Sequence, residues 1–599
     1  MKHPWIAIVL VGFLGECCWA ANVADDRQQA AAALKILEPW QKSHAEATER
    51  FLHVVVWTPS DREFPTGYKD RLSRMLLHIQ NFYAEEMERS GFGPRTFGLQ
   101  LDPQGGVVLH EVEGAQPTRH YAKKSGSEIR TECLPTLVKS GIDPSEATIA
   151  IFCNLATWDE EQLQFTHKSP YYAGGNYRSG TAWQLDSPEL DTWNLPKTTP
   201  VIRDGEYGRI SLGKHNSIFI GGMAHELGHA FGLPHVKERP DEAVRGTALM
   251  GSGNRTYGDE VRGEGRGTFL TFAHALRLAS HPLFCKRIES RKNKVNASLT
   301  DLEIRSDDQA IAVTGTIRGE PPIYGVVAYF DPEGNGDYNQ TSAVAIPAAD
   351  GRFALQSDAL VAGKTGVLRL VPLHASGELD SAATLATMSY SYSIATDGTP
   401  DLEAVKVRLA LAPIVAALRD RDNDRARRLA KAINHEAAAA IATALTDVST
   451  PSQSPAEYQG ASHAVSLTAF APEAAEVGWS RPTYNRVPDS SLLLESAGVV
   501  FATGIYAHPP AKHVYRLGGR WKTLQGKVGI AAGHSGTVRF EIHGDGKELW
   551  KSKTVSAGQL TPFEVDVSGI QQLQLITSPT DDGASSDWGL WLAPQLSAE

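Results

Sequence analysis

Three histidines are spaced along residues 221–235 in a pattern that suits metal binding. His225 and His229 are four residues apart, so on a helix their side chains lie on one face, about one turn from each other. Gly232 lies where that helix is expected to end, because glycine tolerates the left-handed conformation that reverses a chain, and the turn brings in His235 as a third ligand. Three imidazoles favour Zn²⁺ and leave one coordination position open for water, which is the arrangement of a catalytic zinc site.

Glu226 directly follows the first of these histidines and is expected to face the open coordination position. Zinc lowers the pKa of a bound water to about 7, so a neighbouring carboxylate can remove a proton as the water attacks. The same carboxyl group can then return the proton to the departing amine. The residues therefore predict one catalytic Zn²⁺ and hydrolysis of peptide bonds, with Glu226 as general base and general acid.

The stretch HELGHAFGLPH resembles the extended zinc-binding motif of the metzincins, HExxHxxGxxH. Members of that family also carry a methionine on a tight turn beneath the zinc, and Met250 in TALMGS fits that position. The resemblance covers residues 51–286 and implies a metzincin-like zinc protease domain, with a twisted mixed sheet above the active-site helix. It also implies that a substrate peptide binds extended along an edge strand. Ser252 departs from the pattern, because astacin-like and serralysin-like members have a tyrosine there.

The elements expected to position this site alternate between strands and helices. Residues 51–58 (FLHVVVWT) and 147–154 (ATIAIFCN) have the apolar runs of buried strands, whereas 68–89 and 127–139 have helical periodicity. This alternation predicts an α/β sheet that leads into the active-site helix.

Aromatic residues lie on both sides of the expected active-site helix in the sequence. Tyr172 and Trp183 precede it among several glycines, and Tyr257 follows the methionine. Aromatic side chains on a flexible rim can line substrate subsites, although such residues more often belong to a core. Tyr172, Trp183 and Tyr257 are therefore candidates for the substrate rim, with a packing role as the alternative.

Beyond residue 286 the sequence changes to a pattern typical of β-structure. Apolar and polar residues alternate over 297–395 between polar turns, which predicts an all-β Ig-like sandwich. The turn DPEGNGD at 331–337 is a candidate Ca²⁺ site, because oxygen-bearing side chains alternate with glycines. A complete EF-hand would have glutamate where Ser342 stands, so a polar hairpin turn is the alternative. Residues 400–448 have helical periodicity and predict a helical connector of one or two helices.

The last part of the chain, residues 462–599, again shows short strands and glycine-rich turns. The segments AEVGW, FATGIYAH, VYRLGG, FEIHGDGK and DW follow one another in an order that resembles the NPCBM family, the novel putative carbohydrate-binding module. The resemblance implies a C-terminal β-sandwich with affinity for glycans. Sugars stack their apolar faces on aromatic rings while their hydroxyl groups need polar partners. The candidate glycan-binding residues are Trp479, Tyr506, His508 and Trp588.

Composition and the N-terminus are typical of a secreted multidomain protein. The 599 residues exceed what one core supports, and a net charge of -11 argues against nucleic-acid binding, which needs clustered Lys and Arg. Residues 1–20 have the charged, apolar and small-residue layout of a secretory signal peptide, and residues 21–50 predict an N-terminal helical segment. The apolar run is too short to span a membrane, and no later stretch is long and apolar enough. Beyond the predicted signal peptide the sequence has three cysteines, Cys133, Cys153 and Cys285. They are interpreted as buried apolar side chains, with one disulfide as the alternative.

Together these features predict a secreted zinc endopeptidase that acts on protein or glycoprotein substrates and binds glycans through its C-terminal domain. Two alternatives remain. One is a non-catalytic glycan-binding adhesin with a metal-stabilised scaffold, against which Glu226 argues because a structural site has no use for it. The other is a zinc hydrolase of non-peptide amides, which the motif does not exclude.

Overall fold

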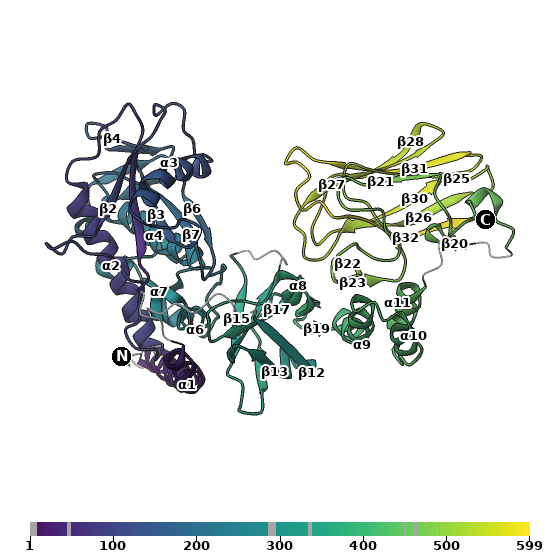
Figure 1. Ribbon diagram of the computed structural model, residues 1–599, viewed down its shortest axis with the longest axis horizontal. Helices are drawn as coiled ribbons and strands as arrows, with labels where there is room; N and C mark the ends of the chain where they lie inside the picture. The colour runs from purple at the N-terminus through teal and green to yellow at the C-terminus, as the bar shows by residue number, and fades with distance from the viewer. Residues whose placement is uncertain are drawn as a thin grey trace, which may run out of the picture.

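The computed structural model describes residues 9–44, 49–285, 295–332, 338–447, 451–460, 464–489 and 491–598. Figure 1 shows, in chain order, an α/β region with an N-terminal helix, a first β-sandwich, a helical connector and a C-terminal β-sandwich. The chain is therefore multidomain, with mixed α/β structure and many β-sheets, as the sequence predicts.

A five-stranded mixed sheet forms the centre of the α/β region. Its order is β2 (Leu109–Glu113), β1 (Leu52–Thr58), β3 (Thr148–Cys153), β7 (Gly180–Leu185) and β6 (Tyr172–Gly175). All neighbours are parallel except β6, which runs antiparallel to β7 at the edge. Consecutive buried residues such as Val54, Val55 and Val56 show that β1 is covered on both faces.

Helices cover both faces of this sheet. They are α2 (Tyr68–Arg89), α3 (Gly126–Lys139) and α4 (Leu212–Ala230). Ile129 of α3 and Ile151 of β3 belong to the hydrophobic cluster of one face. Leu76 of α2, Leu227 of α4 and Phe152 of β3 belong to the cluster of the other face. Because successive strand residues point to opposite faces, the position of a residue along its strand decides which helices it meets.

Shorter elements complete the α/β region. They are β4 (Ala156–Asp159), β5 (Gln164–His167), β8 (Val201–Asp204) and β9 (Gly208–Ser211) in a second sheet, β10 (Thr247–Ala248) paired with β11 (Thr268–Phe269), and helices α5 (Asp259–Arg262), α6 (Phe272–Leu278) and α7 (Pro282–Cys285). Cys133 and Cys153 are buried and Cys285 is half-buried, and none of the three is in a disulfide. The interpretation of the first two as buried apolar side chains is confirmed.

The N-terminal helix α1 (Val9–Ser43) spans the boundary between the predicted signal peptide, residues 1–20, and the predicted helical segment, residues 21–50. The part after this boundary packs on the α/β region, where Ala30 and Leu37 are fully buried. None of the helices within the described ranges combines the length and apolarity that crossing a membrane requires.

The first β-sandwich consists of two antiparallel sheets. One contains β12 (Asn296–Asp307), β13 (Ala310–Glu320) and β16 (Arg352–Ser357), and the other contains β15 (Thr341–Ala345), β14 (Ile323–Asp331), β17 (Thr365–His374), β18 (Ser389–Ile394) and β19 (Pro400–Asp401). Helix α8 (Ala382–Thr387) precedes β18. Val313 of β13 and Ala328 of β14 belong to one hydrophobic cluster, so the two sheets pack face to face.

The first β-sandwich also shares a hydrophobic core with the α/β region. Tyr324 and Val327 of β14 lie in the same buried cluster as Leu276 of α6. The Tyr324 hydroxyl donates a hydrogen bond of 2.6 Å to the carbonyl oxygen of Leu276. The α/β region and the first β-sandwich are therefore joined by one hydrophobic core, and the sandwich is not a loosely attached spacer.

The helical connector contains α9 (Glu403–Arg419), α10 (Asn423–Lys431) and α11 (Glu436–Thr446), where the sequence predicts one or two helices. The additional break falls at Arg421, which has a φ of 62°. The Asp422 side chain then caps α10 by accepting a hydrogen bond from the backbone N–H of Arg425. A single helical periodicity does not reveal such a break.

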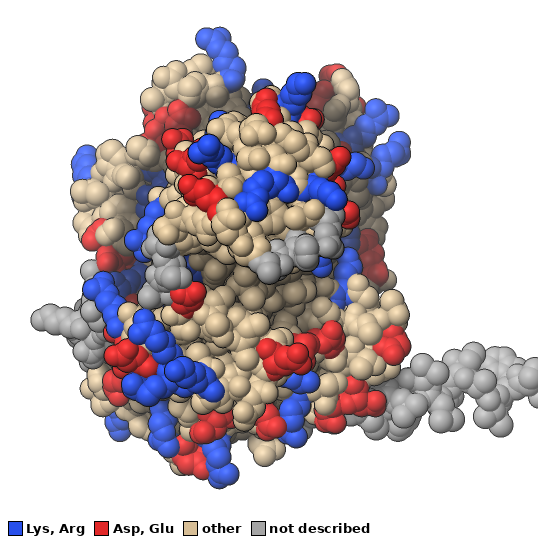
Figure 2. Space-filling view, turned by 90° about the vertical axis from the view of Figure 1, so that its right-hand side faces the viewer, with Lys and Arg blue, Asp and Glu red and all other residues tan. Residues whose placement is uncertain are grey.

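The C-terminal β-sandwich also has two antiparallel sheets. One contains β20 (Ala464–Ser466), β32 (Gly589–Ser597), β26 (Thr523–Ile530), β30 (Leu560–Asp566) and β24 (Gly504–Tyr506); the other contains β21 (Ala474–Glu476), β25 (Ala511–Arg516), β31 (Gln572–Pro579), β27 (Thr537–Gly544), β28 (Lys547–Lys551) and β29 (Val555–Ser556). A separate hairpin joins β22 (Leu494–Ser496) to β23 (Val499–Phe501). Figure 2 views this end of the molecule and shows basic and acidic side chains intermixed over the surface.

Candidate metal centre

Helix α4 positions two of the predicted metal ligands. The Ser211 hydroxyl caps its first turn by accepting a hydrogen bond of 3.0 Å from the backbone N–H of Lys214. The helix ends at Ala230, and Gly232 has a φ of 82°, which is the left-handed conformation that the sequence predicts there. The chain then reverses and returns to the same side of the helix.

The three predicted ligands converge in the structure. One ligand atom each from His225, His229 and His235 lies within 4.8 Å of the other two. The Nε2 atoms of His229 and His235 are 3.1 Å apart. Two nitrogens that share a tetrahedral zinc at about 2.0–2.1 Å lie roughly 3.3 Å from each other. The donor set and the spacing therefore fit one Zn²⁺ ion.

Backbone carbonyl groups orient two of these imidazoles. The Nδ1 atom of His225 lies 2.7 Å from the carbonyl oxygen of Leu249, and Nδ1 of His229 lies 2.9 Å from that of Leu233. A proton on each Nδ1 leaves the Nε2 lone pair available for a metal. Burial lowers the pKa of His225 to about 3 and that of His229 to about 4, so both rings are neutral at pH 7.

Glu226 is the titratable group beside this cluster. Its side chain is buried, and desolvation raises its pKa to about 7. A carboxyl group with a pKa near neutrality can both accept and donate a proton at physiological pH. The arrangement therefore has the donor set of a metal centre and a group suited to proton transfer.

Met250 lies on a tight turn beneath the helix. The backbone N–H of Gly251 donates to the carbonyl oxygen of Ala248 at 2.9 Å, which closes the turn, and Met250 is fully buried. Its Sδ atom is 2.3 Å from the position that a Cβ on Gly228 would occupy, so the helix and the turn are in close contact. The turn also supplies the Leu249 carbonyl that orients the first ligand.

Tyr172 and Trp183 do not line the metal site. They face each other across the β6–β7 pair, with ring centroids 5.0 Å apart, and the Tyr172 hydroxyl accepts a hydrogen bond from the backbone N–H of Gly126 at the start of α3. Trp183 belongs to the hydrophobic cluster on the α3 face of the sheet, opposite α4. This placement corrects the rim expectation for Trp183, which is buried on the α3 face, whereas Tyr172 is exposed on the edge strand β6 and its rim role stays a prediction.

Tyr257 is also placed in the core rather than at a rim. Its exposed fraction is 4%, and its ring packs against Phe82 of α2. A Cβ on Gly221 of α4 would lie 2.4 Å from the Cβ of Tyr257, so this residue packs directly against the helix. Tyr257 therefore has a packing role, which was the alternative to a place on the substrate rim.

Two further aromatic residues, Tyr338 and Tyr171, lie near the metal site, and the first of them was not predicted. The Tyr338 ring stacks on His235 with centroids 3.8 Å apart and an angle of 28° between the planes. Burial and the nearby Glu226 carboxylate raise the pKa of Tyr338, and the same two causes raise the pKa of Tyr171. Tyr171 adjoins the candidate Tyr172, but no local pattern links Tyr338 to a motif about a hundred residues earlier.

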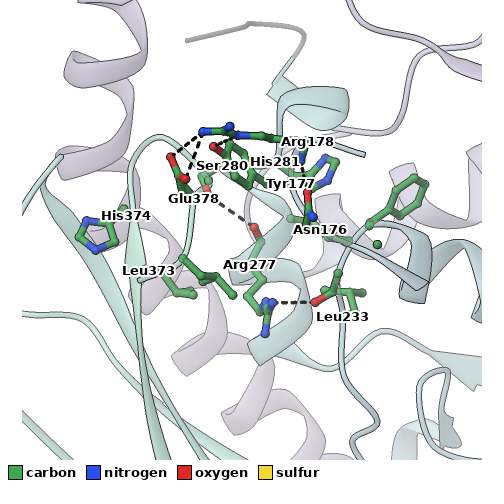
Figure 3. Close-up of a pocket in the computed structure, with 16 residues that line it drawn as sticks. Asn176, Tyr177, Arg178, Leu233, Arg277, Ser280, His281, Leu373, His374 and Glu378 are labelled. Carbon is green, nitrogen blue, oxygen red and sulfur yellow. Dashed lines mark hydrogen bonds and ion pairs between the residues drawn. The ribbon is translucent and has the colours of Figure 1, made fainter. Parts of the chain in front are cut away.

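A cavity of about 370 Å³ lies between the α/β region and the first β-sandwich (Figure 3). Arg178, from the loop after β6, forms an ion pair of 3.2 Å with Glu378 of the sandwich. Arg277 of α6 donates a hydrogen bond of 2.6 Å to the carbonyl oxygen of Gly232. His225, His229 and His235 do not line this cavity, so it is distinct from the candidate metal centre.

In the C-terminal β-sandwich, three of the four candidate glycan-binding residues lie together. Trp479 is half-exposed, with ring centroids 5.0 Å from Trp588 and 6.4 Å from His508. His534, which was not predicted, stacks on Trp588 at 4.0 Å. Tyr506 is fully buried beneath Trp588, so its ring cannot stack on a sugar and its expected role is corrected to packing.

The candidate Ca²⁺ turn falls largely outside the described residues, which do not include 333–337. At its start, Asp331 is fully buried and forms an ion pair of 3.0 Å with Arg369. That carboxylate therefore already has a cationic partner within the sandwich.

The fold and the site together define a class of protein: an α/β region with a zinc-compatible histidine cluster and an adjacent glutamate, followed by β-modules. Residues 463–597 match the family described as NPCBM/NEW2 domain. The C-terminal β-sandwich is therefore an NPCBM domain, as the resemblance implies. No curated protein matches the chain.

Solved structures give more particular similarities. Wild-type OgpA from Akkermansia muciniphila is 26% identical over 59% of this chain and 95% of that chain, with a TM-score of 0.48. A catalytically inactive OgpA in complex with an O-glycopeptide (glycodrosocin) substrate is 25% identical over 60% and 97%, also with a TM-score of 0.48. The CBM51 of Clostridium perfringens GH95 in complex with methyl-galactose is 20% identical over 22% and 99%, with a TM-score of 0.21.

Proposed function

We propose that this protein is a secreted zinc-dependent endopeptidase of the metzincin type that acts on glycosylated proteins. The observation that carries the proposal is the convergence of His225, His229 and His235, with Glu226 next to the first of them in the sequence. The carbonyl groups that orient the first two rings support it, because they preorganise the Nε2 atoms for a metal. Met250 is proposed to be the methionine of the Met-turn.

In this proposal three histidines hold the metal and Glu226 transfers the proton during peptide hydrolysis. Bound at the three histidines, Zn²⁺ would acidify a water molecule and polarise the scissile carbonyl group. The Glu226 carboxylate would take a proton from the attacking water and pass it to the nitrogen of the departing amine. Burial of Glu226 favours both transfers, because it raises the pKa of the carboxyl group to about 7, close to physiological pH.

The edge strand β6 is the proposed binding site for the peptide backbone. It is paired on one side only, with β7, and Gly174 and Gly175 on it are exposed. An extended peptide can add to such an edge through main-chain hydrogen bonds. A Cβ on Gly174 would meet no atom within 4 Å, which leaves room for close approach of the substrate, whereas Gly175 is packed against the carbonyl oxygen of Ala230 in α4.

The NPCBM domain supports a glycoprotein substrate. Trp479, Trp588, His508 and His534 form the proposed glycan-binding cluster, in which Trp479 is the exposed ring and the buried Trp588 and His508 support it. Binding a glycan would raise the local concentration of the attached peptide at the catalytic site.

Metal analysis and cut-site mapping test the proposal together. Purified protein and its Glu226→Gln variant are assayed for bound zinc and then incubated with a mixture of glycosylated proteins, whose new termini are identified by mass spectrometry. New peptide termini with the wild type alone, in zinc-loaded protein, are expected. Glycan binding without new termini in either protein supports the adhesin alternative instead. Release of amines without new termini supports a hydrolase of non-peptide amides.

A further inference from the structure

The first β-sandwich contacts the segment that follows the third metal ligand. The Gln340 side chain donates a hydrogen bond of 2.6 Å from Nε2 to the carbonyl oxygen of His235. The backbone N–H of Lys237 donates to the carbonyl oxygen of Gln340 at 2.7 Å. Farther along, Arg239 donates to the carbonyl oxygen of Ser342 at 3.1 Å. These three bonds align the two segments side by side.

Gln340 is itself held by a buried polar chain. Its side chain is fully buried, and its Oε1 atom accepts a hydrogen bond from Arg369. Arg369 is fixed in turn by its 3.0 Å ion pair with the buried Asp331. Buried charges are tolerated only when they are paired, so this chain gives the Gln340 amide one defined orientation. The amide N–H groups are thereby directed at the metal-ligand segment.

Tyr338 contacts the same ligand from the side of its ring. It is stacked on His235, and its centroid is also 6.1 Å from that of His225. Stacking of this kind restricts rotation of the imidazole about its side-chain bonds. The backbone of His235 and its ring are therefore both contacted by residues of the sandwich.

We propose that the first β-sandwich helps to form the metal centre by positioning the third ligand, and that Gln340 is a positioning residue for His235. The α/β region orients His225 and His229 through its own carbonyl groups. The third ligand lies beyond the helix on a segment that contacts both the Met250 turn, through the Val236 N–H and the Met250 carbonyl oxygen, and the sandwich. Groups that orient ligands in this way raise metal affinity by about 10- to 100-fold. The inference rests on the proposed function, since it assumes that the three histidines bind zinc.

The test measures zinc affinity by competition with a chelator, together with the absorption spectrum of the cobalt-loaded protein. Gln340→Glu keeps the size of the side chain and its acceptor for Arg369 but removes the donor to His235. We expect zinc binding to weaken about 10- to 100-fold, with a changed cobalt spectrum. Tyr338→Leu is the second variant, because its exposed fraction of 53% makes it tolerant of substitution. We expect it to weaken zinc binding in the same direction.

Glu378→Gln provides the matched control. It breaks the ion pair with Arg178 that joins the same two bodies, visible in Figure 3, but it touches no metal ligand. Zinc affinity within about twofold of the wild type in this variant supports the proposal. Equal weakening in Glu378→Gln and Gln340→Glu overturns it, because the sandwich would then act only through docking. Wild-type affinity in both Gln340→Glu and Tyr338→Leu also overturns it, whereas a wild-type protein that binds no zinc overturns the proposed function itself.

Discussion

Glu226 illustrates how burial adjusts the chemistry of a single side chain. It follows His225 on α4 and has an exposed fraction of only 9%, so its charged form is poorly solvated. The resulting pKa of about 7 lies more than two units above the ordinary value for glutamate. Replacement by glutamine keeps the shape of the side chain and removes its ability to take up a proton.

The first prediction concerns this residue. Glu226→Gln should lower kcat for peptide hydrolysis by about 10²- to 10⁴-fold, which is the usual contribution of general acid–base catalysis. Zinc content should be unchanged, because glutamine leaves the three imidazoles intact. His229→Ala is the comparison variant and should lose zinc as well as activity. Wild-type turnover by Glu226→Gln, measured with zinc bound, would assign the proton transfers to another group.

Some residues of the site are predictable from sequence, and others are not. His225, His229 and His235 lie within eleven residues, and the helical repeat alone places two of them on one face. The face to which Trp183 points depends on where β7 begins, and a shift of one residue reverses it. Aromatic character alone gives no information about that register.

At the scale of elements, α4 is packed tightly along the side that faces the chain after the Met250 turn. A Cβ on Gly221 would lie 2.7 Å from the carbonyl oxygen of Asn254 as well as close to Tyr257. A backbone oxygen cannot move aside as a flexible side chain can. The glycines of this helix therefore allow the close contact that brings the turn beneath the metal ligands.

The second prediction follows from this contact. Gly221→Ala gains up to about 1 kcal/mol of helix propensity but overpacks a rigid contact, which typically costs about 1–3 kcal/mol or more. We expect net destabilisation of about 1–2 kcal/mol, measured by calorimetric unfolding. Gly174→Ala on β6 is the matched control, because a Cβ there meets no atom within 4 Å. A Gly221→Ala protein as stable as the control would show that the helix can shift away from the turn.

The third prediction concerns β25 of the C-terminal β-sandwich. Burial lowers the pKa of His513 to about 4, against about 6.5 for a solvated histidine. The unfolded chain therefore takes up a proton below pH 6.5 that the folded domain resists, and stability falls as the pH drops from 6.5 to 4. The loss should reach roughly 3 kcal/mol. His513→Gln should unfold more readily at pH 8, but its free energy of unfolding should fall less steeply between pH 6.5 and 4. An equally steep fall in the variant would show that a group other than His513 causes the loss of stability.

At the scale of the whole molecule, the sequence predicts the separate bodies better than the contacts between them. Hydrophobic periodicity is local, and it correctly indicates an α/β region, β-structure, a helical connector and more β-structure. The contact between His235 and Gln340 joins residues about a hundred positions apart and rests on an amide and a carbonyl group. No repeat or spacing signals such a bond, so the sandwich resembles a spacer until the fold is known.

The fourth prediction links the two ends of the molecule. Trp479→Ala should weaken binding to immobilised mucin-type glycoprotein by about tenfold, because it removes the most exposed ring of the proposed cluster. Cleavage of a short unglycosylated peptide should be unaffected, since the catalytic residues are remote. Trp550→Phe, in β28 of the same domain and outside the proposed cluster, is the control and should bind normally. Unchanged glycoprotein binding by Trp479→Ala would show that this surface is not the glycan-binding site.

The core that the α/β region shares with the first β-sandwich has a consequence for biosynthesis. Synthesis proceeds from the N-terminus, so the residues through 285 emerge while Tyr324 and Val327 are still to be made. Until those side chains arrive, the apolar surface around Leu276 has no cover, and a nascent chain of this length is expected to require a chaperone. The α/β region is therefore expected to complete its folding only when the sandwich has been synthesised.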